Sequence, residues 1–388
     1  MKYKALIFIF WFCISGLSSQ TQENPYQRLD ALMDGTADSL TSMHAVAKYV
    51  NRNYGTEYEK SRALFYWISQ NVSYSPDLMY TFRTGDDWSQ LAKDAFDNKV
   101  AICTGYAALF DTLCKLCNIP CYIVVGSTRQ DFLPAIIGHV WNAVKIYNEW
   151  QIVDPTWGTG YLQGNRFVKK INNTYFLADP EKIIKSHLPI DPIWQMLKRP
   201  VTLYQFHAQL KSNAYMDWHY ADSIEVFLKS DELTQIRSVL RRLKEFGNNS
   251  EVTANYTNYL KAKELNYYNS LLNLALKNYN QGVEKYNRYV DFKNHQFSPA
   301  KPDEIIRKMI PEVLENLGLA EKQYKLVINE IDDANYKEGI NSNLSQLVEL
   351  MNQARQEKKF VDKYLATPKN KRRDLFYTKI YPGAGSGR

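Results

Sequence analysis

The pattern of hydrophobic and polar residues predicts an α+β core in the first half of the chain. Residues 102–118 carry apolar side chains at helical spacing, and Pro120 follows where the helix should end. A strand bounded by Gly126 is expected next, at 121–128, and two runs of alternating, β-branched and aromatic residues follow at 139–147 and 149–157. Such alternation is typical of strands, and the two runs predict an antiparallel hairpin. We therefore expect a helix packed on an antiparallel sheet.

Beyond residue 200 the pattern changes to seams in which apolar residues step by four and three positions. This spacing predicts an all-helical, antiparallel, coiled-coil-like bundle over 201–365, because it lets helices pack at small crossing angles. Pro311 predicts a kink or a later start of the second helix. Residues 366–388 contain KNKRR and PGAGSGR, and we expect a flexible tail there. The predicted seams are Leu272, Leu276, Tyr279, Val283, Tyr286 and Val290; Ile306, Ile310, Val313, Leu317, Ala320, Tyr324, Val327 and Ile331; and Ile340, Leu344, Leu347, Met351, Ala354, Val361 and Leu365.

The N-terminus has the features of a secretory signal. MKYK is positively charged, ALIFIFWFCI is apolar, and SGLSSQ is small and polar. The apolar run is too short for an ordinary membrane span, so we interpret residues 1–20 as a signal peptide that is cleaved near residues 18–20. This leaves 21–200 as the first domain. We expect the protein to be exported to the periplasm or the extracellular space, in a bacterial cell.

The charge of the chain argues against nucleic acid as its main partner. Lysine and arginine together number 48 and aspartate and glutamate 41, which gives a formal net charge of +7. Neither predicted domain carries the strong basic excess that nucleic-acid binding needs. The KNKRR run is interpreted as a solvated segment.

Four cysteines remain after the signal peptide, and they lie within nineteen positions: Cys103, Cys114, Cys117 and Cys121. The CxxC at 114–117 has no second CxxC or HxxxH to complete a structural zinc site, so no metal is expected. Export permits a disulfide among the last three cysteines, and buried free thiols are the alternative.

Cys103 begins the predicted helix, and it is either a buried core thiol or a nucleophile. The N-terminus of a helix lowers the pKa of a thiol, and a thiol nucleophile needs a base and a group that orients the base. His139 is the only histidine in the predicted sheet, and Asp154 ends the next strand. A pairing of residue 139 with residue 154 requires a hairpin tip over about 145–148. Each residue alone has an ordinary structural explanation, but the ordered set favours a Cys-His-Asp triad.

Other residues are expected to complete this site. The backbone N–H of Cys103 is a natural oxyanion donor, and a second donor must come from upstream. The candidates for that donor are Trp88, Tyr74 and Gln90. The residues expected to line the site are Gly105, Tyr106, Trp141 and Trp157. Gly105 permits close backbone approach, and the two tryptophans are expected to shield the His-Asp pair from water.

Three segments around the candidate residues resemble a known family. ICTGYAALFDTLCKLCNIPCYIVVG and GHVWNAVKIYNEWQIVDPTWG resemble the transglutaminase-like superfamily, whose members share a papain-type core. The segment YFLADPEKIIKSHLPIDPIWQML resembles its kyphoscoliosis-peptidase-like branch. The resemblance covers about residues 40–205 and implies Cys103 as nucleophile, His139 as general base and Asp154 as the residue that orients His139. Ala101 and Val140 depart from the usual Gly and Ala, but neither touches the reacting groups.

The resemblance implies acyl transfer through a thioester, with a protein or peptide as substrate and no cofactor. We favour hydrolysis of peptide or glutamine amide bonds. A protein-glutamine transglutaminase that cross-links is the first alternative, although no acidic cluster suggests a calcium requirement. A non-catalytic binding module, in which the helical bundle contacts a partner protein or the cell envelope, is the second. Oligomerisation is left open.

Overall fold

The computed structural model describes residues 24–377, except for 37–38, 81–86, 131–132, 165, 213–216, 248–249 and 332–333. The predicted signal peptide lies outside the described residues, so export stays a prediction. No helix in the described part of the chain is long and apolar enough to cross a membrane. The chain divides into two compact units, residues 1–257 and residues 258–388.

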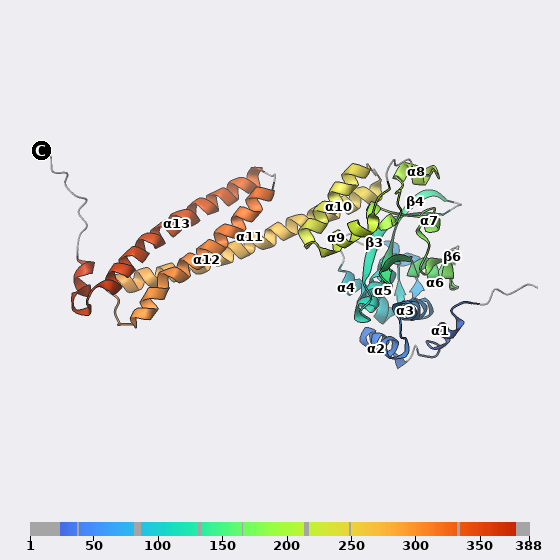
Figure 1. Cartoon of the computed structure of the whole chain (residues 1–388), viewed down its shortest axis with the longest axis horizontal. Coiled ribbons are helices and arrows are strands. Elements are labelled where there is room, and N and C mark those ends of the chain that lie inside the picture. The colour runs from blue at the N-terminus through green and yellow to red at the C-terminus, as the bar shows by residue number, and fades with distance from the viewer. Residues whose placement is uncertain are drawn as a thin grey trace, which may run out of the picture. The chain divides into compact units, whose positions relative to one another are not determined.

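The first unit combines helices with a small antiparallel sheet, and the second consists of helices (Figure 1). The predicted fold class is therefore confirmed. The helices of the first unit are α1 (Gln27–Ala31), α2 (Met43–Asn53), α3 (Glu57–Asn71), η2 (Pro76–Tyr80), α4 (Trp88–Asn98), α5 (Cys103–Leu116), α6 (Pro155–Thr159), η3 (Asn173–Tyr175), α7 (Pro180–Ile183), η4 (Pro192–Gln195), α8 (Leu203–His207), α9 (Tyr220–Lys229) and α10 (Glu232–Phe246). Its strands are β1 (Ser73–Tyr74), β2 (Val100–Ala101), β3 (Cys121–Gln130), β4 (Leu133–Ile146), β5 (Glu149–Val153), β6 (Gly160–Gln163), β7 (Arg166–Lys169) and β8 (His187–Pro189).

The main sheet has the strand order β5-β4-β3-β8, and each neighbouring pair is antiparallel. The hairpin of β4 and β5 closes through Tyr147 and Asn148, which both have positive φ, as a two-residue turn of the type that suits twisted strands requires. This register places Asn142 opposite Val153. The predicted pairing of residue 139 with residue 154 across a longer tip is therefore wrong.

Helix α5 is held against the sheet and against α3 by its buried face. Tyr106, Leu109, Phe110 and Leu113 are fully buried in the core cluster, which also contains residues from α2 and α3. Two polar contacts fix its position: the Tyr106 hydroxyl donates to the carbonyl of Val72 at 2.9 Å, and the Asn142 amide donates to that of Ala107 at 3.0 Å. The first turn of α5 is thereby set at a defined place relative to β4.

Helices α9 and α10 are part of the first unit, which ends at residue 257, whereas the sequence predicted a domain boundary at residue 200. Trp194 stacks on Tyr122 with ring centroids 4.2 Å apart, and Phe227 of α9 lies edge-on to both rings. Arg242 of α10 makes two hydrogen bonds to Asp191, at 2.7 and 2.6 Å. These contacts explain why residues 201–257 belong with the sheet.

The second unit is formed by most of α11 (Glu251–Asn294) together with α12 (Asp303–Glu330) and α13 (Ala334–Ala366). The seam predicted along α12 is buried throughout, and α12 continues through Pro311. On α11 the buried face differs from the predicted seam: Leu276, which belongs to that seam, is 48% exposed. The residues of α11 that are buried at seven-residue spacing are instead Tyr268, Ala275, Gly282 and Tyr289.

Structure continues into the segment that was predicted to be a flexible tail. The turn η5 (Lys369–Phe376) follows α13, and Arg372 makes two hydrogen bonds to Asp303, at 2.7 and 2.8 Å. Phe376 packs edge-on against Phe297 and Tyr364. Residues 369–376 therefore pack on the helical unit, and residues 378–388 lie outside the described part of the chain.

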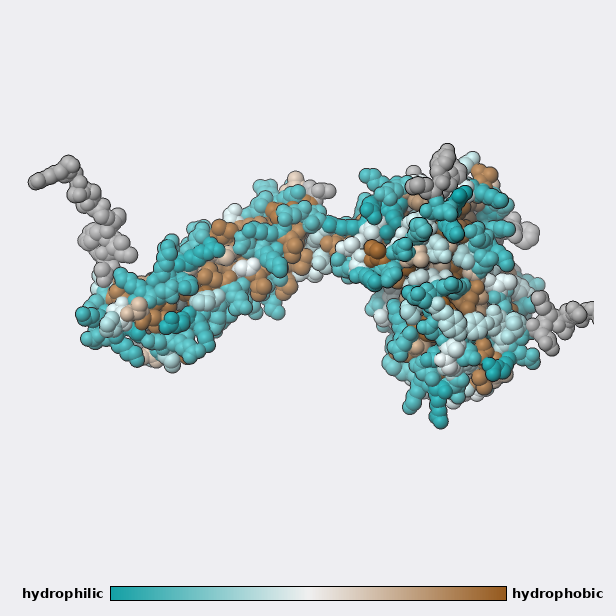
Figure 2. Space-filling model, viewed as in Figure 1, coloured by the Kyte–Doolittle hydropathy of each residue, from teal (hydrophilic) through white to brown (hydrophobic). Residues whose placement is uncertain are grey.

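Hydrophobic side chains also reach the surface of the second unit, where brown patches run along its helices (Figure 2). Examples that are 40–49% exposed are Leu265, Leu274, Leu276, Leu319, Leu326 and Val348. Single exposed leucines are ordinary on protein surfaces. The predicted contact of this unit with a partner stays a prediction.

Candidate active site

Cys103 is the first residue of α5, and the preceding backbone is extended at Ile102. The short strand β2 ends one residue earlier and pairs in parallel with β1, which fixes where the helix begins. The first N–H groups of a helix have no partner within it, and they give this end a partial positive charge. The Cys103 thiol is half-buried. It therefore lies at the positive end of a helix and is partly open to solvent.

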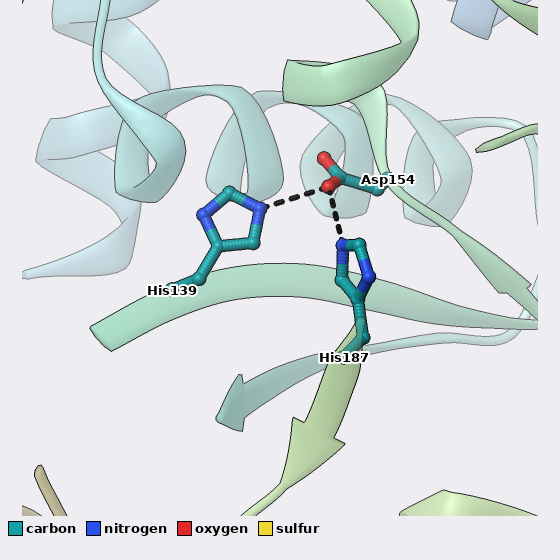
Figure 3. Close-up of side chains that lie close together, drawn as sticks. All are labelled: His139, Asp154 and His187. Carbon is teal, nitrogen blue, oxygen red and sulfur yellow. Dashed lines mark hydrogen bonds and ion pairs between the residues drawn. The ribbon is translucent and has the colours of Figure 1, made fainter. Parts of the chain in front are cut away.

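His139 and Asp154 meet although their residues are not paired across the hairpin. Continuing the register beyond Val153 would place Asp154 beside Trp141, two residues along β4 from His139 and on the same face of the strand. From this diagonal position the carboxylate oxygen Oδ2 lies 2.8 Å from Nε2 of His139 (Figure 3). Both side chains are buried, with exposed fractions of 7% for His139 and 0% for Asp154.

Asp154 is also the N-cap of α6, so the capping function and the predicted orienting function coincide in one side chain. Its second oxygen, Oδ1, accepts hydrogen bonds from the backbone N–H groups of Thr156 at 2.8 Å and Trp157 at 3.1 Å. Pro155 occupies the first helical position, where the missing N–H is harmless. The cap fixes the carboxylate plane and leaves Oδ2 directed at the histidine.

The buried carboxylate of Asp154 favours the protonated form of His139. Burial opposes a charge on His139, but the Asp154 carboxylate, together with a hydrogen bond and the charge of Cys103, raises the pKa of His139 to about 10. Burial would raise the pKa of Asp154, but His139 and His187 outweigh it and hold that pKa well below its usual range. Because Nε2 of His139 is bonded to Asp154, its Nδ1 is the nitrogen left to exchange a proton with Cys103.

A second histidine, His187, contacts the same carboxylate oxygen. Its Nε2 lies 3.0 Å from Oδ2 of Asp154, and its side chain is 1% exposed (Figure 3). It comes from β8, where it pairs with Thr128 of β3. The prediction that His139 is the only histidine of the sheet is therefore wrong. The sequence held one signal for His187, the HLP motif of the segment that resembles the kyphoscoliosis-peptidase-like branch, but β8 has only three residues and shows no alternation.

The three groups His139, Asp154 and His187 offer ligand atoms within 4.8 Å of one another, a composition that a divalent ion can use. Both imidazoles are nevertheless within hydrogen-bond distance of the same oxygen, at 2.8 and 3.0 Å. A shared acceptor at these distances is the geometry of a proton network, and hydrogen bonds account for it without an ion.

Aromatic rings enclose this network. Trp141 lies 5.9 Å from His139 and 5.1 Å from His187 between ring centroids. Trp157 lies 5.6 Å from His139 and 4.6 Å from His187, and Tyr175 contacts both Trp157 and His187. Trp141 and Trp157, which were expected to line the site, thus both lie beside the two imidazoles. Low local polarity strengthens the hydrogen bonds between the buried groups.

The three candidates for the second oxyanion donor lie in different surroundings. Tyr74 of β1 is opposite Ala101 in the register; burial and then the nearby Cys103 thiol raise its pKa to about 12, so its hydroxyl stays a donor. Trp88 is the half-buried first residue of α4. Gln90 is exposed and donates to the carboxylate of Asp94 at 2.8 Å. Of the three, Tyr74 is the one whose described interactions include Cys103.

The other two residues expected to line the site contribute to packing. A Cβ at Gly105 would lie 2.8 Å from the Cβ of Ala101 and 3.3 Å from that of Ala95, so glycine is needed for the close approach of α4 and α5. The ring of Tyr106 is fully buried behind the helix. Cys114, Cys117 and Cys121 are free thiols, and burial raises the pKa of each.

Gly126 leaves space for the Trp141 ring beside the site, and its replacement gives a first testable prediction. It lies between His139 of β4 and Pro189 of β8, and an added Cβ would meet the Trp141 ring and lie 2.5 Å from the Leu188 carbonyl oxygen. We expect Gly126→Ala to reduce the free energy of unfolding by about 1–3 kcal/mol or more. Urea denaturation measures this; Gly318→Ala, where no atom lies within 4 Å of the added Cβ, is the control. Equal stability of the two variants would contradict the packing described.

Comparison with known proteins agrees with this geometry. Residues 44–155 match the family model described as the transglutaminase-like superfamily. This region of the chain is therefore similar to the transglutaminase-like superfamily. Kyphoscoliosis peptidase from Homo sapiens is 32% identical over 171 residues, which are 41% of this chain and 25% of that protein. The Mus musculus kyphoscoliosis peptidase is 29% identical over 202 residues, 48% of this chain and 30% of its own length.

The predicted resemblance to the kyphoscoliosis-peptidase-like branch is thus confirmed for the transglutaminase-like region. This chain spans only 25–30% of the length of these two relatives. A solved structure described as a TGase is 18% identical and covers 42% of this chain and 40% of its own, with a TM-score of 0.24. A superposition this partial bears on neither the fold nor the chemistry.

Proposed function

We propose that this protein is an exported cysteine hydrolase that cleaves peptide or glutamine amide bonds with Cys103, His139 and Asp154. One observation carries the proposal: Nε2 of His139 is held at 2.8 Å by a buried carboxylate while Cys103, at the start of α5, interacts with the same imidazole. A nucleophile, a base and a group that orients the base are what thiol catalysis requires. The transglutaminase-like region and the kyphoscoliosis peptidase relatives support the same chemistry.

The first half of the reaction forms a thioester. His139 takes the proton of the Cys103 thiol at Nδ1, and the thiolate sulfur forms a bond to the carbonyl carbon of the substrate amide. The backbone N–H of Cys103 and the Tyr74 hydroxyl donate to the oxyanion. His139 then gives its proton to the leaving nitrogen as the C–N bond breaks, and Asp154 stabilises the imidazolium throughout.

The second half releases the product. Water attacks the thioester carbonyl carbon while His139 accepts a proton from it, and the C–S bond breaks to give a carboxylic acid. The proton returns to the sulfur, so the enzyme is regenerated. If a primary amine replaces water, the same steps give a new amide, which is the reaction of a transglutaminase.

A product analysis separates these reactions. We expect the full chain to produce new peptide termini or deamidated glutamine from a peptide library, whether or not a primary amine is added. Mass spectrometry identifies the products, and the Cys117→Ser variant, which replaces a buried thiol away from the reacting groups, is the control. If the main product instead contains the added amine, the protein is a cross-linking transglutaminase and the proposal of hydrolysis is wrong. If no product depends on Cys103, the protein is a binding module instead.

A further inference from the structure

The carboxylate of Asp154 accepts more hydrogen bonds than a three-residue site needs. Oδ1 accepts two backbone N–H groups, at 2.8 and 3.1 Å. Oδ2 lies within hydrogen-bond distance of two imidazoles, His139 at 2.8 Å and His187 at 3.0 Å. The carboxylate is completely buried, so every one of its four acceptor positions is satisfied by protein.

The surroundings of His187 define which of its nitrogens carries the proton. Asp154 is ionised and accepts only, so Nε2 of His187 must donate to it. In the neutral ring, Nδ1 is then an acceptor, and the Ser186 hydroxyl lies 2.8 Å from it. Ser186 can alternatively donate to the carbonyl of Ile183 at 3.2 Å. The local partners therefore fit the neutral tautomer with its proton on Nε2.

We infer that His187 is a positioning residue, which holds Oδ2 of Asp154 in line with His139 and thereby extends the site to Cys103–His139–Asp154–His187. The inference rests on the proposed function, because it concerns how that site holds its carboxylate. With His187 in place, four bonds prevent rotation of the carboxylate. Without the N–H of His187, Oδ2 loses one of its two hydrogen bonds. Because the carboxylate is completely buried, water does not easily replace that bond.

His187 is neutral at working pH although a carboxylate faces it. The groups that face it are the Asp154 carboxylate, the His139 ring and, in ring contact, the Tyr175 phenol, with the Ser186 hydroxyl at Nδ1. Burial lowers the pKa of His187, although Asp154 opposes that shift. Because the folded-state pKa lies below the unfolded value of about 6.5, its neutral form contributes stability above that pH which is lost as the pH falls. His187 can therefore donate without competing for the catalytic proton.

Two variants of the full chain separate positioning from packing. His187→Gln keeps an Nε2–H donor at similar reach but does not titrate, and His187→Phe fills the space without a donor. The readout is the rate at which iodoacetamide alkylates Cys103 between about pH 5 and pH 9. We expect His187→Phe to be about tenfold slower at pH 7 and its acidic limb to move to higher pH, because an Asp154 carboxylate that is no longer held in line with His139 stabilises the imidazolium less. His187→Gln should stay within about threefold of the unmodified chain.

The results that would overturn the inference are distinct from those that would overturn the proposed function. Equal slowing of both variants with an unchanged pH profile would mean that His187 only packs, and unchanged rates in both would mean that it has no role. If Cys103 of the unmodified chain reacts no faster than an ordinary thiol, the proposed function fails, and a second measurement then decides on His187.

That measurement is a nitrogen-15 NMR spectrum of the histidine side chains, of which the chain has six. The His187 signals are assigned by their loss in His187→Gln. We expect a neutral ring protonated at Nε2 at pH 7, and a shift of the His139 signals in His187→Phe. A His187 ring protonated at Nδ1, or at both nitrogens, at pH 7 would contradict the inference whether or not the protein is an enzyme.

Discussion

Replacing Cys103 with serine is expected to reduce kcat/KM for amide hydrolysis by at least about 10³-fold, because the site is built for a thiol. A serine hydroxyl gives up its proton far less readily, and the imidazolium that His139 forms would have no thiolate to pair with. The half-buried position of Cys103 at the start of α5 tolerates the exchange, so the fold should be retained.

The matched control is Cys117→Ser, at a buried thiol whose sulfur makes a long contact, 3.9 Å, to the carbonyl of Ala47. We expect its kcat/KM to stay close to that of the unmodified chain. Steady-state kinetics on a peptide identified from the library gives both values. Full activity of Cys103→Ser would exclude Cys103 as the nucleophile.

Asp154→Asn is expected to lower kcat/KM by about 10³–10⁴-fold while α6 keeps its cap. The asparagine oxygen can still accept the N–H groups of Thr156 and Trp157, which directs its amide NH₂ at His139. Nε2 of His139 must then accept, so its proton moves to Nδ1, the nitrogen that should take the proton of Cys103. The base is present but in the wrong tautomer.

Asp179→Asn is the control, because Asp179 also precedes a proline and caps a helix, α7, but its side chain is exposed. A similar loss in both variants would attribute the effect to capping. The variants should also differ in the pH dependence of stability. The raised pKa of His139 stabilises the fold below its unfolded value of about 6.5, and this contribution is lost as the pH rises through about 10. The stability lost in Asp154→Asn should therefore be largest below about pH 6.5 and shrink toward pH 10.

The parts of the site that were predictable from sequence are those that local pattern determines. The helix over 102–118 and the strands around residues 139 and 154 occur as α5, β4 and β5 within a few residues. The hairpin register was missed because Tyr147 adopts a positive φ that a bulky residue rarely takes. Its backbone N–H donates to the Glu57 carboxylate at 2.7 Å, a contact from a distant helix that no local pattern contains.

Tertiary contacts also explain the differences in the helical region. The seam predicted on α11 follows large apolar residues, whereas the buried seam uses Ala275 and Gly282. A Cβ at Gly282 would lie 2.7 Å from a methyl group of Leu317, so a small residue is required where α11 crosses α12. A prediction from hydrophobic spacing relies on large apolar side chains, so it does not detect contacts that depend on small residues. On α12, where the large residues face inward, the same method placed the whole seam correctly.

The most direct test of the account is the alkylation of Cys103 by iodoacetamide in the purified full chain, followed between about pH 5 and pH 9 with the adducts mapped by mass spectrometry. We predict fast alkylation of Cys103, already at the acidic end of this range, and a marked slowing in His139→Ala. Cys114, which is completely buried, serves as the internal reference and should stay unmodified in the folded chain. Reaction of Cys103 at the rate of an ordinary thiol, unchanged in His139→Ala, would contradict the assignment of this site as catalytic.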